Sequence, residues 1–222
     1  MNKPLVHSYS AIKEFQNCAR KYHAVRILKQ FKQQDTQATL YGTAVHKAFE
    51  EFIANGAPLP EAFEQYRAFV EPLTKVPGDV YCEKKLGVRA DFSPCDFFAS
   101  DVWFRGIPDY LVVNHETSVA RVGDFKTGKS SRYADPGQLE LMAAMVMAHF
   151  PTITKVKGAL LFVVAKDVIT SEYTRDQLPV IWSCWGGHAN AIEKARERDV
   201  WNASPSGLCK FCPLSEAACE HR

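Results

Sequence analysis

A strand, helix and strand pattern in the second half of the chain most limits what the sequence can fold into. Residues 119–126 have the β-branched and aromatic side chains typical of a strand, and residues 156–165 form a second, very apolar strand. Between them, Asp135 and Pro136 mark the N-cap and first turn of a helix that reaches Phe150. A helix joining two strands predicts parallel pairing through a right-handed crossover. The pattern therefore indicates an α/β fold.

The first third of the chain predicts helices. Ser10 is a suitable N-cap for a helix whose apolar side chains recur at helical spacing and which contains Cys18. A second helix is expected over residues 40–55, with Gly56 as its C-cap, and a third over residues 60–71. The helical part thus precedes the sheet.

Short runs of β-branched and aromatic residues follow. They predict strands of a mostly antiparallel meander over residues 80–88, 99–104 and 110–113. A last amphipathic helix, over residues 187–201, leads into a tail rich in Ser, Pro and Gly.

The composition of the 222 residues is that of an ordinary globular protein, with 46% apolar and 23% charged residues. One principal domain is the default for this length. The longest apolar run, residues 158–165, is far shorter than the ~20 residues of a membrane span, so we expect a soluble, cytoplasmic protein without membrane contact. The formal charge of +2 does not by itself indicate nucleic acid, so any such claim must rest on a site.

Seven cysteines, an odd number, fit poorly with a fully paired disulfide framework. Three of them, Cys209, Cys212 and Cys219, crowd the tail, and the first two form a CxxC loop. The tail therefore resembles a ligand loop. Its spacing does not separate zinc from an iron–sulfur cluster.

An Asp-Phe-Lys sequence ends the strand over residues 119–126. Alternation sends Asp124 and Lys126 to one face of the sheet and Phe125 to the other. The carboxylate can hold Mg²⁺ or Mn²⁺, and the ammonium can orient a water or offset charge on a phosphate. A surface ion pair at a strand end explains the same residues about as well.

A second acid, Asp109, lies fifteen residues upstream in the sequence Gly-Ile-Pro-Asp. Two adjacent strands could bring Asp109 and Asp124 to one ion. An aspartate in a turn beside proline is commonplace by itself. The combination of PD followed by DxK is far less common by chance.

Six motifs in sequence order resemble the PD-(D/E)XK nuclease superfamily, and specifically its RecB-like branch of iron–sulfur exonucleases. Each motif is weak alone, and together they span nearly the whole chain. Relatives of this compact size look like phage or CRISPR-associated exonucleases. The motifs are Cys18 in FQNCARKY, Gly42 to His46 in GTAVH, Gly106 to Asp109, Asp124 to Lys126, Gln138 in QLELM, and Cys209, Cys212 and Cys219.

The resemblance implies a restriction-endonuclease-like α/β fold, with a central mixed β-sheet flanked by helices. It also implies that an N-terminal helical part and a C-terminal cysteine tail are joined by a metal cluster. A single nuclease domain would span residues 1–222, with the helical part at 1–75, the nuclease core at 76–170, and the last helix and cysteine tail at 171–222.

By the same resemblance, one Mg²⁺ or Mn²⁺ ion would be held by His46, Asp109, Asp124 and the backbone carbonyl of Phe125. Unaided, a histidine beside an apolar helical face is more often a packed structural residue. Its place four residues after Gly42 matches the histidine ligand of the family, and imidazole suits Mn²⁺ as well as Mg²⁺.

The resemblance also assigns catalytic roles. Lys126 would place and deprotonate the attacking water, leaving a 5′ phosphate and a 3′ hydroxyl. Gln138 would orient the nucleophile or the phosphate, although a polar residue at a helix start is almost as good an explanation. Met142 departs from the family, which often has tyrosine at this position.

Cys18 is the implied fourth thiolate beside the three of the tail. A [4Fe–4S] cluster is favoured, with Zn²⁺ as the main competitor and a reduced set without a ligand as the third alternative. A link between residues 18 and 219 closes almost the entire chain, so its expected role is structural.

The implied function is that of a metal-dependent DNA exonuclease, acting on single strands or DNA ends in phage or bacterial replication, recombination or repair. A phage-encoded protein would work in the host cytoplasm. No P-loop sequence is visible, so unwinding would require a partner, such as a helicase or a recombination protein. Cationic and aromatic residues that suit a single-strand groove, or equally a solvated surface, are Arg20, Lys21, Tyr22, Lys129, Arg132 and Tyr133.

Two other classes of function stay open. In one, the protein is a nuclease-like DNA-binding recombination factor that has lost cleavage, which the presence of Asp109, Asp124 and Lys126 disfavours. In the other, it is a zinc-stapled interaction module, and the DxK strand is a coincidence.

Overall fold

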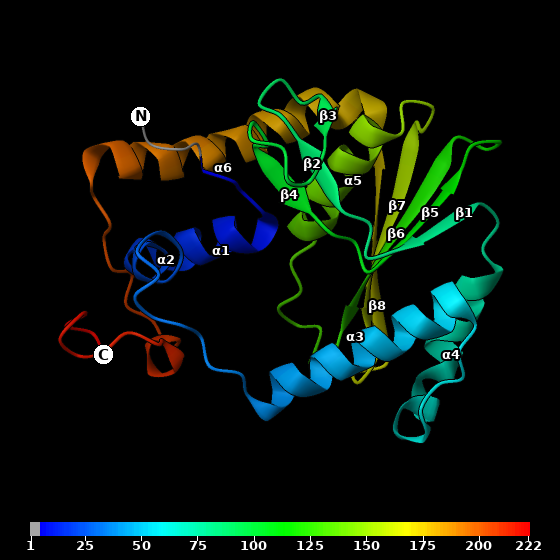
Figure 1. Cartoon of the computed structure of the whole chain (residues 1–222), viewed down its shortest axis with the longest axis horizontal. Coiled ribbons are helices and arrows are strands. Elements are labelled where there is room, and N and C mark those ends of the chain that lie inside the picture. The colour runs from blue at the N-terminus through cyan, green and yellow to red at the C-terminus, as the bar shows by residue number, and fades with distance from the viewer. Residues whose placement is uncertain (1–4) are drawn as a thin grey trace.

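The computed structural model describes residues 5–222, and its centre is a five-stranded mixed sheet of order β1-β5-β6-β7-β8 (Figure 1). Strands β6 and β7 pair in parallel, and the other neighbours are antiparallel. The predicted mixed sheet with one parallel crossover is therefore confirmed. The strands are β1 Asp79–Cys82, β5 Tyr110–Asn114, β6 Val119–Lys126, β7 Lys155–Phe162 and β8 Asp167–Thr174.

Helices cover both faces of this sheet. On one face, α5 (Gly137–His149) packs onto the even-numbered apolar side chains of β6, and α6 (Leu178–Arg198) packs onto α5. On the other face, α3 (Gln37–Asn55) and α4 (Arg67–Val70) pack around Phe125. The alternation of a strand thus divides the core into two clusters, one on each side of β6.

A second, three-stranded sheet of order β3-β2-β4 adjoins the first. Its strands are β2 Leu86–Val88, β3 Pro94–Cys95 and β4 Phe104–Gly106. The single strand predicted over residues 80–88 is wrong, because the chain turns at Glu83, whose φ of 52° lies in the left-handed region. The strand predicted over residues 99–104 also shrinks to its last residue, since only Phe104 belongs to β4.

The N-terminal helix differs from its prediction at both ends. Helix α1 (Tyr9–Asn17) is capped by the Ser8 side chain rather than by Ser10. Cys18 does not lie within a helix, because its extended backbone separates α1 from α2 (Ala19–Tyr22). A π-helix, His23–Ile27, continues the segment.

The remaining helices shift relative to the pattern. Gly56 closes α3 with a φ of 65°, as predicted, but the third predicted helix is broken, with 3₁₀ turns on both sides of α4. Helix α5 starts after Pro136, and Asp135 accepts a hydrogen bond from its first amide. Helix α6 begins nine residues before the prediction and ends three before it. The 3₁₀ helices are Glu61–Tyr66, Glu71–Lys75, Arg175–Gln177 and Cys209–Phe211.

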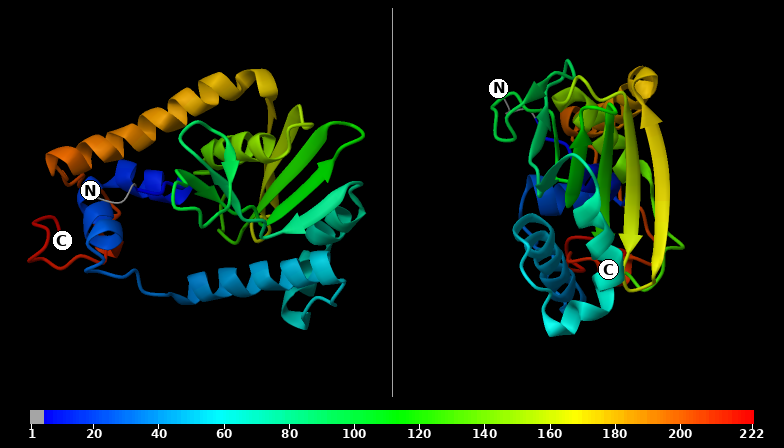
Figure 2. Two further views of the ribbon diagram at one scale, coloured as in Figure 1. Left: turned by 45° about the horizontal axis from the view of Figure 1, so that its top comes forward. Right: turned by 90° about the vertical axis from the view of Figure 1, so that its right-hand side faces the viewer.

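The C-terminal tail returns to the N-terminal helices. Figures 1 and 2 both show the tail beside α2, and Arg20 of α2 forms an ion pair with Glu220. Across residues 5–222, no helix combines the length and apolar character that crossing a membrane requires.

Candidate active site

Asp109 and Asp124 lie side by side at the end of two neighbouring strands. Tyr110 of β5 is opposite Gly123 of β6, so the residues that flank this pair are neighbours as well. The backbone N–H of Phe125 donates a 2.6 Å hydrogen bond to Oδ2 of Asp109, which holds this carboxylate against β6. The two acids of the PD and DxK motifs therefore lie close together.

Asp124 is the most buried acid of the site, with 7% of its surface exposed. Burial raises its pKa, and the charge of Asp109 raises it further against the opposing effect of Lys126. Its Oδ2 atom faces the Lys126 ammonium at 2.6 Å, but within residues 5–222 it has no partner with hydrogen-bond geometry. Lys126 and Asp124 therefore form an ion pair by distance. Oδ2 of Asp124 can still accept a bond from another ligand.

Gln138 closes a triangle with Asp124 and Lys126. Its amide oxygen accepts a 2.8 Å hydrogen bond from Lys126 Nζ, and its amide nitrogen donates to Oδ1 of Asp124. Gln138 lies in the first turn of α5, the crossover helix that follows β6. The helix therefore fixes the position of the lysine ammonium.

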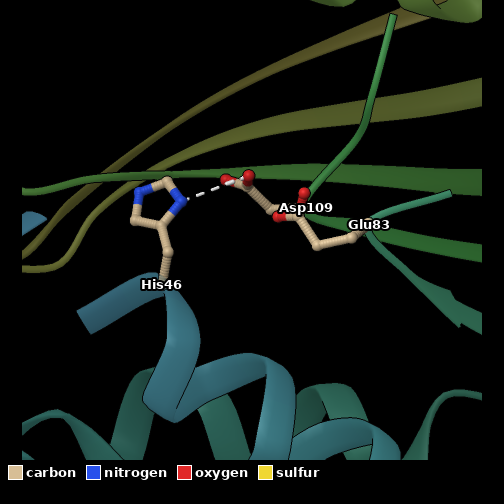
Figure 3. A group of neighbouring side chains, drawn as sticks. All are labelled: His46, Glu83 and Asp109. Carbon is tan, nitrogen blue, oxygen red and sulfur yellow. Dashed lines mark ion pairs between the residues drawn. The ribbon is translucent and has the colours of Figure 1, made fainter. Parts of the chain in front are cut away.

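His46 reaches the acids from α3, on the other side of the sheet. Its Nδ1 atom lies 3.2 Å from Oδ1 of Asp109, as Figure 3 shows. Burial lowers the pKa of His46, but the hydrogen bond to Asp109, the charges of both aspartates and a hydrogen bond to the backbone of Phe125 outweigh this and leave the pKa raised. His46, both aspartates and the Phe125 carbonyl thus lie in one neighbourhood.

Close contact between α3 and β6 explains the spacing of Gly42 and His46. A Cβ atom on Gly42 would lie 3.1 Å from the hydroxyl of Thr127, which is tighter than an ordinary van der Waals contact. One turn further on, the rings of Phe49 and Phe125 pack edge to face at 4.9 Å. These contacts between α3 and β6 position His46 beside Asp109.

Glu83 is a site residue that the sequence analysis missed. Possible ligand atoms of His46, Glu83 and Asp109 all lie within 4.8 Å of one another (Figure 3). Cys82, the last residue of β1, pairs with Tyr110. Glu83 directly follows β1 and so lies beside Asp109. Partial desolvation and the charge of Asp109 raise the pKa of Glu83. Only this long-range register could have identified Glu83, because no local motif surrounds it.

The donor set fits a hard divalent cation. Carboxylates, one imidazole and a backbone carbonyl are ligands suited to Mg²⁺ and Mn²⁺. Burial, together with the charge of Asp109, raises the pKa of both Asp124 and Glu83. Met142, the departure from the family pattern, lies outside this group and packs 3.0 Å from the position of a Cβ on Gly106.

The four cysteines of the predicted cluster share one cavity of about 590 Å³ between α1 and the tail. Within residues 5–222, no three of these thiols come within 4.8 Å of one another. Backbone N–H groups of Lys21 and Ser206 donate to two of the sulfurs. The lining residues of this cavity include Cys18, Cys209, Cys212 and Cys219.

The predicted DNA-contact residues divide into two groups. Tyr22 is 2% exposed and stacks on Trp201, so its ring cannot receive a base. Its neighbours Arg20 and Lys21 form ion pairs with Glu220 and Glu14. The second group is exposed, and the guanidinium of Arg132 lies over the 86% exposed Tyr133, close to Lys129 in the same loop.

The fold resembles that of solved structures at low sequence identity. The crystal structure of a "putative exonuclease" from Eubacterium rectale matches with a TM-score of 0.56 and 14% identity, covering 97% of this chain and 87% of that one. The structure of SSO0001 matches with a TM-score of 0.49 and 11% identity, covering 97% and 90% of the two chains. Curated proteins gave no significant match. The first likeness supports the restriction-endonuclease-like α/β fold.

Fold and donor set together define a class of metal-dependent nucleases. A sequence model of the PD-(D/E)XK nuclease superfamily matches residues 6–220. The chain therefore belongs to the PD-(D/E)XK nuclease superfamily.

Proposed function

We propose that the protein is a RecB-like DNA exonuclease that hydrolyses phosphodiester bonds in single-stranded DNA or at DNA ends. The observation that carries this proposal is the convergence of Asp109, Asp124 and Lys126 at one sheet edge, with the ammonium 2.6 Å from the buried carboxylate. Its setting is phage or bacterial DNA replication, recombination or repair, in the cytoplasm. A helicase or recombination protein is the partner that separates the strands.

The ligands that would hold Mg²⁺ or Mn²⁺ are His46, Asp109, Asp124 and the carbonyl of Phe125, and Glu83 is a further carboxylate within reach. When bound, the cation supplies Lewis-acid polarisation of the phosphate and favours ionised water. Asp109 is kept in place by the Phe125 N–H, and His46 by Asp109. The carboxylates therefore need little rearrangement on binding.

Lys126 acts on the attacking water. Its ammonium donates a hydrogen bond to Gln138 and lies 2.6 Å from Asp124, so at least one of its three N–H donors remains for a water or a phosphate oxygen. The water attacks phosphorus in line with the departing 3′ oxygen, so the products carry a 5′ phosphate and a 3′ hydroxyl. Gln138 keeps the lysine pointed at this position.

The second cofactor in this proposal is a [4Fe–4S] cluster bound by Cys18, Cys209, Cys212 and Cys219, with Zn²⁺ as the alternative. Support comes from the shared cavity and from the backbone N–H groups directed at two sulfurs, since hydrogen bonds to sulfur stabilise thiolate ligands. Its role is structural, because it lies between the two ends of the chain.

DNA contact in this proposal includes Lys129, Arg132 and Tyr133 of the loop after β6, with weaker support for Arg20 and Lys21. The loop follows the catalytic strand directly, and its exposed aromatic ring and cations suit a single strand. The inactive DNA-binding factor is less favoured, because both acids and the lysine are present and paired. The zinc-stapled module leaves the acid cluster unexplained.

A nuclease assay tests the proposal. Wild-type protein with Mg²⁺ or Mn²⁺ should release short products from end-labelled single-stranded or duplex DNA. Lys126→Ala should lower the rate by about a hundredfold or more without changing folding or DNA affinity. Lys194→Ala, which removes an exposed lysine of α6, is the matched control. Undiminished cleavage by Lys126→Ala would show that the site is misplaced.

A further inference from the structure

The three-stranded sheet carries a cluster of aromatic and cationic residues, namely Lys85, Phe97, Phe98 and Arg105. Lys85 follows Glu83 by two residues, and Arg105 precedes Asp109 by four. An extended chain covers at most about 3.5 Å per residue, so their Cα atoms lie within about 7 Å and 14 Å of those acids. The backbone at Lys85 and Arg105 is therefore close to that of the proposed cation site.

Two phenylalanines of the loop between β3 and β4 complete the cluster. The guanidinium of Arg105 lies 4.9 Å from the ring centre of Phe97 and 5.6 Å from that of Phe98. The ammonium of Lys85 lies 5.2 Å from the ring centre of Phe98. The Asp96 side chain accepts a hydrogen bond from the backbone N–H of Phe98, which shapes the turn that presents the ring.

Both cations lack an acidic partner. Within the described part of the chain, neither Lys85 nor Arg105 forms an ion pair, whereas the nearby Arg89 is paired with Asp101. The Nε atom of Arg105 is buried and has no hydrogen-bond partner among residues 5–222. Phe98 has 67% of its surface exposed, an unusual position for a large apolar ring.

We infer that the cluster of Lys85, Phe97, Phe98 and Arg105 binds single-stranded DNA next to the scissile phosphate, with a base on Phe98 and phosphates at the two cations. The inference rests on the proposed function, to which it adds a strand-binding surface. It identifies an element separate from the loop after β6.

The chemistry of this cluster favours an unpaired strand. An exposed ring stacks on a base only when the base is free of its complement, and every base offers a face, so binding is tolerant of sequence. Unpaired cations supply the attraction to phosphate that does not depend on sequence. In a duplex the base faces are already stacked, so a duplex would contact only Lys85 and Arg105 through its phosphates.

Binding of fluorescein-labelled oligothymidine in EDTA tests the inference without cleavage. Phe98→Ala should weaken the affinity about fivefold or more, while the affinity for a duplex of the same length stays unchanged. Val180→Ala, which truncates a 73% exposed side chain on α6, is the matched control and should bind like wild type. Unaltered thermal unfolding of each variant confirms that the fold is kept.

Salt dependence separates stacking from charge. Lys85→Ala should lower the slope of log affinity against log salt by about 0.7, as expected for the loss of one phosphate contact on a single strand. Phe98→Ala should leave the slope unchanged. Lys194→Ala is the charge-matched control and should also leave the slope unchanged.

Cleavage kinetics complete the test. With Mg²⁺, Phe98→Ala should raise the KM for the oligonucleotide about fivefold or more and leave kcat near that of wild type. If wild type cleaves DNA while Phe98→Ala and Lys85→Ala bind and cleave like their controls, the inference is overturned and the proposed function stands. If wild type binds oligothymidine but cleaves no DNA, the proposed function fails instead. An equal loss of duplex binding in Phe98→Ala also overturns the single-strand assignment.

Discussion

Asp124 is an acid of the site at which burial and a neighbouring negative charge act in the same direction. Its carboxylate is buried beside Asp109, and both effects raise its pKa. Asp124 forms an ion pair with Lys126 and accepts a hydrogen bond from Gln138. One ammonium does not neutralise the three carboxylates of Asp109, Asp124 and Glu83. A divalent cation is the group that would relieve this repulsion, so binding of a cation should stabilise the fold.

Thermal unfolding with and without Mn²⁺ tests this expectation. At a Mn²⁺ concentration about 100 times its dissociation constant, the free energy of unfolding should rise by about 2.7 kcal/mol. Asp109→Asn keeps the shape of the side chain but removes its charge, so most of this gain should disappear. Asp79→Asn, at an exposed carboxylate of β1, should retain it. An equal gain in both variants would place the cation elsewhere.

At the scale of elements, a buried histidine links the N-terminal segment to the small sheet. His7 forms a parallel bridge with Phe104 and is fully buried. Burial, with a smaller effect of Arg196, lowers the pKa of His7 from 6.5 to about 4. The neutral ring is therefore the form that the fold requires.

The free energy of unfolding should consequently fall as the pH is lowered through a defined range. Because the pKa of His7 is lower in the folded state, its contribution is complete above pH 6.5 and is lost as the pH falls from 6.5 towards 4. Between pH 7 and pH 5 the loss should be about 2 kcal/mol of unfolding free energy. His7→Phe should reduce the decline measured by urea unfolding, whereas His115→Gln, at a half-exposed ring, should keep it. Parallel declines in all three proteins would contradict this role.

The periodicity of the sequence correctly predicted those elements that pack against the next element along the chain. The crossover from β6 through α5 to β7 and the αL cap at Gly56 follow from local pattern, and so were correct. The break at Glu83 has no local signal, whereas the start of α6 has one that the sequence analysis missed, a proline at Pro179 in the first turn. Asp109 and Asp124 were found through motif order, while Glu83 required the pairing of β1 with β5.

At the scale of the whole molecule, the C-terminal tail meets the N-terminal helices α1 and α2. The cavity between α1 and the tail has the four cysteines on its walls, and the ion pair of Arg20 with Glu220 lies beside it. An exposed ion pair contributes little on its own. Ala24 also packs against Leu214 and Cys219, and the proposed cluster would add metal–thiolate bonds to these apolar contacts.

Anaerobic purification and hydrogen exchange test that link. Wild-type protein should be brown and contain about four iron atoms per chain, as a [4Fe–4S] cluster requires. Cys219→Ser should lose the colour and the amide protection of residues 19–36 and 200–222, while β6 and β7 stay protected. Cys184→Ser, at an exposed cysteine of α6, should keep both. Colourless wild-type protein containing zinc would replace the iron with the alternative metal and leave the nuclease proposal intact.

The convergence of α3, β1, β5 and β6 on one point has a consequence during biosynthesis. His46 leaves the ribosome well before the strand that carries Asp124 has been translated, and Glu83 reaches Asp109 only once β1 has found β5. A nascent chain that ends before β6 lacks Asp124 and so holds no complete set of these ligands. Hydrolytic activity is therefore expected only after these four elements have assembled.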